Sequence, residues 1–124
     1  MPTLVFAVAR VLLAALMLIG AFNMLMYRFA PELFPPLHPV MRIFVESGYL
    51  LVPKLVELVG GALLLTRYRA LGLTLLWPVV LNIALYHAFF DARLGFMGAL
   101  LIVLCALCSW PERSAWVRLV TPTR

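Results

Sequence analysis

Two charged side chains interrupt one of the most apolar runs of the sequence. Lys54 and Glu57 lie three residues apart among Pro, Leu, Val, Gly and Ala. A charge at the centre of a bilayer costs about 2.5–3.5 kcal/mol on insertion scales, so such residues normally face the protein interior and pair. On a helix the two side chains are about 60° apart and can touch. Arg10 is the other candidate partner of Glu57. Either it forms a structural ion pair with Glu57, or its side chain extends to the near membrane surface.

A second group of polar residues lies in another apolar run, where Asn82, Tyr86 and His87 occur close together. His87 and Asp91 are four residues apart, so on a helix the carboxylate can orient and charge the imidazole. Histidine changes charge near neutral pH and can exchange a proton with a carbonyl oxygen, which makes His87 the candidate catalytic residue. Asn23, near the end of the first apolar run, is expected at the same depth.

Each of these side chains also has an ordinary structural explanation. Asn82 can bond a neighbouring backbone, and a histidine near an interface can simply be solvated. Several polar side chains at one depth in so small a protein nevertheless indicate a cavity. The predicted ligand-binding residues are Asn23, Lys54, Glu57, Asn82, Tyr86 and His87.

Four apolar segments must position these residues. Of the 124 residues, 65% are hydrophobic and 12% are charged, whereas soluble domains are about 45–50% apolar and 25% charged. Segments of membrane-spanning scale cover residues 4–27, 49–66, 70–90 and 94–110. Four such segments with short connections predict an all-α protein, an antiparallel four-helix transmembrane bundle that occupies the chain as one domain.

The connections and small residues add local detail. Four prolines between residues 31 and 39 prevent a long helix there. Residues 40–46 place apolar and charged side chains as a short helix lying in the membrane interface would. Gly61 lies one turn after Glu57 and exposes backbone to a neighbouring helix, and Gly95 with Ala99 predicts a close-packing face on the fourth segment.

The arginines predict the orientation. One side of the bundle would carry Arg67, Arg69, Arg113, Arg118 and Arg124. The opposite side would carry Arg28, Arg42 and Arg93, offset by Glu32, Glu46 and Asp91. The positive-inside rule therefore places both termini in the cytoplasm and the polar residues in the outer half of the membrane. The net charge of +5 is scattered over segment ends, which argues against nucleic-acid binding.

Cys105 and Cys108 have the spacing of a redox pair. The predicted orientation puts them at the cytoplasmic end, where reducing conditions disfavour a disulfide. We therefore interpret them as small apolar core residues. Pro111 is expected to end the fourth segment, followed by a basic tail. The sequence contains no metal-ligand set, nucleophile triad, haem attachment motif or phosphate loop.

The sequence resembles the DoxX-like family of small four-span bacterial membrane proteins over nearly its whole length. The resemblance rests on Arg10, on Lys54-x-x-Glu57 leading into Gly60-Gly61, and on Pro78-x-x-x-Asn82-Ile83-x-x-Tyr86-His87. It implies a location in the bacterial inner membrane and an association with redox or quinone biology. The chain lacks a cysteine pair on the outer side, which counts against thiol oxidation.

Two functions stay open at this point. One is a binding or redox-associated subunit, with or without catalysis, for a small lipophilic molecule such as a quinone. The other is a non-catalytic membrane partner or assembly subunit, which would stabilise or recruit another protein or form a homo-oligomer. Both place the chain in the lipid bilayer, and they differ in whether the polar site holds a ligand.

Overall fold

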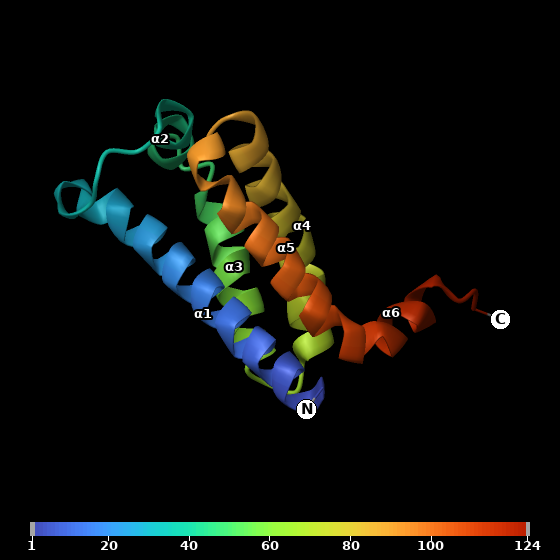
Figure 1. The fold of residues 1–124 in the computed structure, drawn as a ribbon. Helices are drawn as coiled ribbons and strands as arrows, with labels where there is room; N and C mark the ends of the chain where they lie inside the picture. The colour runs from blue at the N-terminus through green and yellow to red at the C-terminus, as the bar shows by residue number, and fades with distance from the viewer. Residues whose placement is uncertain (1, 124) are drawn as a thin grey trace.

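Four long helices dominate the computed structural model, which describes residues 2–123 (Figure 1). They are α1 (Pro2–Phe29), α3 (Leu51–Leu64), α4 (Arg69–Phe89) and α5 (Gly95–Ser109). Helix α1 packs against α3 and α5, α3 packs against α4, and α4 packs against α5, which closes a ring of contacts. The described residues contain no strand, so the prediction of an all-α protein is confirmed.

Three helical stretches are long and apolar enough to cross a membrane. They are Thr3–Phe29, Arg69–Phe89 and Ala92–Val120. A fourth crossing requires α2 (Pro39–Glu46) and α3 together, and these two helices meet at an angle of 89°. Helix α3 has 14 residues and therefore measures about 21 Å, less than the roughly 30 Å of a hydrocarbon core. The predicted span 49–66 is thus a helix, but a shorter one.

Helix α2 confirms the short helix predicted for residues 40–46. It begins at Pro39, whose missing N–H is tolerated in the first turn. The side chain of His38 caps this end, because its Nδ1 accepts from the N–H of Val40 at 3.2 Å. Gly48 then turns the chain into α3 with a φ of 82°, a backbone conformation that favours glycine. Helix α2 therefore lies at the end of the molecule where α1 ends and α3 begins, here called the α2 end (Figure 1).

The apolar core lies toward the opposite end, near the N-terminus, here called the termini end. Its fully buried members come from α1, α3, α4 and α5 and include Leu13, Ala14, Leu64, Leu73, Leu76, Val80 and Cys105. Cys105 and Cys108 are both buried free thiols within this core, as expected for small apolar residues. In Figure 1, α1 diverges from the other long helices toward the α2 end. The buried core therefore lies at the end of the molecule where the long helices converge.

Helices α3 and α4 approach most closely at two glycines. A Cβ added at Gly72 would lie 2.8 Å from the carbonyl oxygen of Gly60, and one added at Gly60 would lie 2.8 Å from Cγ of Leu76. The neighbouring Gly61 faces α1 instead, where an added Cβ would lie 3.2 Å from Cγ of Leu18. Two successive glycines thus allow α3 to pack against two different helices, as predicted for Gly61.

The close-packing face predicted on α5 is shifted along the helix. A Cβ at Gly98 would lie 2.9 Å from Cα of Ala84 on α4. An added Cβ at Gly95 meets nothing within 4 Å, and Ala99 is exposed. The prediction for Gly95 and Ala99 was therefore wrong, because which small residue faces a neighbour depends on the rotation of the helix about its axis.

Polar side chains join α4 to the C-terminal part of the chain at the termini end. Trp77 Nε1 donates to Ser109 Oγ at 2.8 Å, and that hydroxyl donates to the Cys105 carbonyl at 2.6 Å. Trp116 Nε1 donates to Thr74 Oγ1 at 2.9 Å. Each of these indole N–H groups therefore has a partner on another helix.

Helix α5 ends at Ser109, just before Pro111, and the basic tail that follows is itself helical. A 3-10 turn at Trp110–Glu112 leads directly into α6 (Arg113–Val120), which projects away from the long helices (Figure 1). Pro111 is accommodated at the start of that turn, where proline needs no amide partner. An ion pair of 3.1 Å between Arg69 and Glu112 ties the turn to the start of α4.

Candidate functional site

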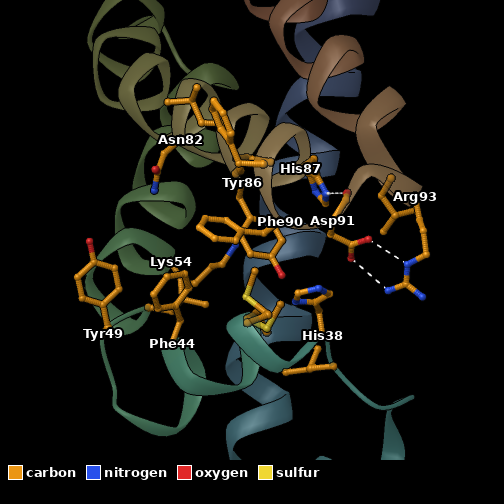
Figure 2. A pocket seen from close by; sticks show the side chains of 18 of the residues that line it. His38, Phe44, Tyr49, Lys54, Asn82, Tyr86, His87, Phe90, Asp91 and Arg93 are labelled. Atoms are coloured by element: carbon orange, nitrogen blue, oxygen red, sulfur yellow. Dashed lines mark hydrogen bonds and ion pairs between the residues drawn. The ribbon is translucent and has the colours of Figure 1, made fainter.

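A cavity of about 780 Å³ lies at the α2 end (Figure 2). Its walls come from α2 and the residues before it, the start of α3, the end of α4 and the turn that follows. Most of the lining surface is apolar, and polar side chains interrupt it on α3, on α4, before α2 and in the turn after α4. This combination of volume and lining is typical of sites for small organic molecules. Helix α2 contributes because its sharp bend from α3 lays it beside the cavity.

Lys54 lies in the wall of the cavity and is anchored by a buried carboxylate. Its Nζ is 2.7 Å from Oε2 of Glu57, and the Glu57 side chain is 2% exposed. This oxygen has no aligned hydrogen bond, so the contact is an ion pair. Glu57 itself does not line the cavity. Of the two predicted site residues on α3, Lys54 therefore lines the cavity, and Glu57 holds Lys54 in place.

The predicted structural pair between Arg10 and Glu57 does not form. Glu57 pairs with Lys54, which is one turn away on the same helix. Arg10 is partly buried, and its Nε has no hydrogen-bond partner in the structure. The i, i+3 spacing explains the outcome, because a partner on the same helix needs no agreement between two helices in depth or rotation.

His87 lines the cavity at the end of α4, and its ring is fixed by the backbone. Its Nδ1 lies 3.3 Å from the backbone carbonyl of Asp91. The Asp91 carboxylate instead accepts from Arg93, from Nε at 2.9 Å and from Nη2 at 3.2 Å (Figure 2). The expectation that this carboxylate charges the imidazole was therefore wrong, because Arg93 competes for it. Hydrogen bonds from Arg93 also lower the pKa of Asp91.

Tyr86 stands between two imidazole rings. Its ring is nearly perpendicular to that of His87, with centroids 5.4 Å apart, and to that of His38, with centroids 6.2 Å apart. The ring of Phe90 also packs against that of Tyr86, with the two ring centroids 5.8 Å apart. The hydroxyl of Tyr86 is buried and has no hydrogen-bond partner in the structure. An aromatic wall with an unsatisfied polar atom is thus part of the cavity.

The two predicted asparagines, Asn82 and Asn23, do not lie in the same site. Asn82 lines the cavity on α4, where it is exposed and makes no hydrogen bond to a neighbouring helix. Its interpretation as a tie between helices is therefore not supported by a contact. Asn23 is exposed on α1 and does not line the cavity, to which α1 contributes Met24 instead. Because the next residue, Met24, does line the cavity, the cause is the rotation of α1 about its axis, which turns Asn23 to the exposed face.

Several lining residues were not predicted from the sequence. His38, Phe44 and Tyr49 come from α2 and its flanks, and Asp91 and Arg93 from the turn after α4. One signal was available for His38, because a polar residue immediately before a proline that opens a helix is a capping position. The aromatic residues gave no such signal, since their roles depend on the angle between α2 and α3.

The site offers binding chemistry of a definite kind. A lysine, two imidazoles, an amide, two phenols and the paired side chains of Asp91 and Arg93 surround an aromatic and aliphatic space. Such a space can enclose an apolar ring while the polar groups orient its oxygen substituents. Within residues 2–123 no group of three or more His, Cys, Asp or Glu side chains is placed to hold a metal ion.

Comparison with known proteins adds one partial match. The chain is 30% identical over 74 residues to the uncharacterized protein YwoB of Bacillus subtilis (strain 168). The match covers 60% of this chain and 44% of YwoB, so the chain matches less than half the length of that relative. No family model and no solved structure matches the chain.

Proposed function

We propose that this protein is an integral membrane protein that binds a small lipophilic molecule with a polar head group, such as a quinone, in the cavity at the α2 end. The long helices would cross the bilayer as an antiparallel bundle in the bacterial inner membrane, with the cavity in its outer half. The resemblance to DoxX-like proteins supports this location and the association with redox biology. The observation that carries the proposal is the cavity itself, whose mostly apolar lining includes several polar side chains.

The buried ion pair favours binding over a purely structural role for Lys54. An ammonium group has three donors, and Glu57 engages it from one side at 2.7 Å. Because Lys54 also lines the cavity, its other donors can bond an oxygen of the ligand. The Glu57 carboxylate supports this arrangement by holding the ammonium group beside the cavity wall. A ligand oxygen with partial negative charge would be stabilised there.

The aromatic residues would hold the ring of the ligand. Tyr86 and Phe90 form a tilted pair in the cavity wall, and Phe44 and Tyr49 form another with centroids 5.3 Å apart. Offset and edge-on aromatic contacts contribute about 0.5–1.5 kcal/mol per pair. A planar ring between these side chains would therefore gain specific contacts in addition to hydrophobic burial.

Binding can be tested with protein purified in mild detergent. Native mass spectrometry should detect a retained small molecule, and a 1,4-benzoquinone bearing a decyl chain should raise the unfolding temperature. We expect His87→Ala to keep the unfolding temperature of the free protein and to weaken this stabilisation. Ser109→Ala, at the termini end, should leave the stabilisation by the probe unchanged.

The alternative role as a non-catalytic membrane partner gives a different outcome in the same experiments. Protein without a retained molecule, unaffected by the quinone and isolated with a second polypeptide would favour that role. Retention of a molecule that His87→Ala does not affect would place binding elsewhere in the molecule.

The proposed orientation has its own test. Single cysteines at Thr66 and Thr123, in a background with Cys105 and Cys108 replaced by alanine, should react with impermeant reagents only from the cytoplasmic side. A cysteine at Pro36 should react only from outside. Labelling of position 36 from the cytoplasm would reverse the orientation and put the cavity in the inner half of the membrane.

A further inference from the structure

The ring of His38 is held in one tautomer by its capping contact. Nδ1 accepts a hydrogen bond from the N–H of Val40 at 3.2 Å. A backbone N–H can only donate, so Nδ1 must carry a lone pair and no proton. The proton of the neutral ring is therefore on Nε2. Because it carries this proton, the free nitrogen of His38 is a hydrogen-bond donor. His38 is one of the residues that line the cavity.

The ring of His87 is held in the opposite tautomer. Its Nδ1 lies 3.3 Å from the carbonyl oxygen of Asp91. A carbonyl oxygen can only accept, so Nδ1 must carry the proton. The Nε2 of the neutral ring is then a lone pair, which makes the free nitrogen of His87 a hydrogen-bond acceptor.

The two rings border one site. Both line the cavity, and both stand edge-on to Tyr86 from different elements, His38 ahead of α2 and His87 within α4 (Figure 2). The Lys54 ammonium in the same wall is a further donor. The cavity therefore presents donors from His38 and Lys54 and an acceptor from His87.

We propose that the cavity selects a head group with a hydroxyl, such as a phenol or hydroquinone, over one that carries only carbonyl or ether oxygens. This inference rests on the proposed function and specifies its ligand class. A hydroxyl donates to the lone pair of His87 and accepts from a donor group. A carbonyl or ether oxygen accepts from His38 or Lys54 but makes no hydrogen bond with the lone pair of the half-buried His87, so the hydroxyl forms one hydrogen bond more.

Two stable probes isolate the hydroxyl. 4-Decylphenol and 4-decylanisole share the ring and the chain, but only the phenol can donate a hydrogen bond. Equilibrium dialysis against the detergent-solubilised protein at mildly alkaline pH, corrected for partition into protein-free detergent, gives both affinities. One additional hydrogen bond predicts that the phenol binds roughly three- to tenfold more tightly than the anisole.

Asparagine substitutions remove the free nitrogen of each ring and keep its other contact. In His87→Asn the side-chain amide can still donate to the Asp91 carbonyl, but the Nε2 acceptor is lost. The preference for phenol should then disappear, with the affinity for anisole kept. In His38→Asn the side chain still caps α2, since asparagine is a good N-cap, but the donor is lost. Both probes should then weaken by a similar factor.

The outcomes separate this inference from the function on which it rests. If neither probe nor the decyl quinone binds to the wild-type protein, the proposed function fails. If the probes bind and the anisole binds as tightly as the phenol, the ligand-binding function stands and the selection for a hydroxyl is overturned. A phenol preference that persists in His87→Asn would also overturn the assignment of His87 as the acceptor. Should an asparagine variant not fold, the wild-type affinity ratio still decides.

Discussion

The two ends of the molecule use polar side chains in different ways. At the termini end each indole N–H that reaches another helix is paired, as Trp77 is with Ser109 and Trp116 with Thr74. At the α2 end Asn82 makes no hydrogen bond to another helix, and the Tyr86 hydroxyl is buried without a partner. An unpaired buried polar atom costs stability. Arg10 Nε, at the termini end, is also buried without a partner. What distinguishes the α2 end is that its unpaired Tyr86 hydroxyl belongs to a residue lining a cavity, where a ligand can supply the missing partner.

Packing follows the same division. Beside the core, α3 and α4 meet at Gly60 and Gly72, where an added Cβ would lie 2.8 Å from the other helix. Toward the α2 end α1 diverges and α2 lies across the space (Figure 1). Close packing on one side and a cavity on the other allow a rigid base to hold a site that has room for a ligand.

The largest effect on stability is expected at the buried ion pair. Glu57→Gln leaves the Lys54 ammonium without its counter-charge, which costs about 3–5 kcal/mol for buried pairs. The matched control is Glu46→Gln, which breaks an exposed i, i+4 pair of 2.9 Å with Arg42 and should change stability far less, because solvent screens exposed pairs. Unfolding in detergent measures both.

A double-mutant cycle identifies the partner. The effects of Lys54→Leu and Glu57→Gln should be strongly non-additive, whereas those of Arg10→Leu and Glu57→Gln should add. Coupling between Arg10 and Glu57 instead would contradict the observed pairing.

The next largest effect is expected at the helix crossing. Gly72→Ala introduces a Cβ 2.8 Å from the Gly60 carbonyl oxygen, which must push α3 and α4 apart and should cost about 1–3 kcal/mol. Gly95→Ala is the control, because its Cβ meets nothing within 4 Å. The control should unfold at nearly the wild-type temperature; equal losses in the two variants would mean that the crossing is not as tight as observed.

A smaller, opposite pair of effects distinguishes the two ends directly. Ser109→Ala removes the acceptor of Trp77 and should cost about 0.5–1.5 kcal/mol without affecting probe binding. Asn82→Leu should leave stability nearly unchanged, because Asn82 makes no contact of this kind, and should weaken binding of the decyl quinone. If Asn82→Leu destabilises the free protein and Ser109→Ala does not, the assignment of a structural and a binding end is reversed.

The smallest effect is expected on stability at acid pH, through the ion pair between Asp91 and Arg93 in the cavity wall. Hydrogen bonds from Arg93 lower the pKa of Asp91 below its unfolded value. The pair therefore contributes stability above about pH 4 and loses it as the pH falls through the lowered pKa. Unfolding temperatures recorded toward low pH should show this loss. Asp91→Asn should remove that part of the pH dependence, and an unchanged profile would mean that the pair does not contribute.

Local spacing by itself determined a large part of this protein. Apolar runs predicted the helices and their approximate limits, because a chain in an apolar environment must satisfy its backbone within each segment. The i, i+3 spacing of Lys54 and Glu57 made their pairing foreseeable, and the sequence also indicated α2. These features depend on residues within a few turns of one another.

Only the tertiary structure decided which residues meet around the cavity. The rotation of α5 about its axis put Gly98 rather than Gly95 against α4, and the rotation of α1 put Met24 rather than Asn23 at the cavity. The 89° bend between α2 and α3 brought His38 to the cavity. Helix rotation, tilt and bending are set by packing between segments distant in sequence, and hydrophobic periodicity does not record them.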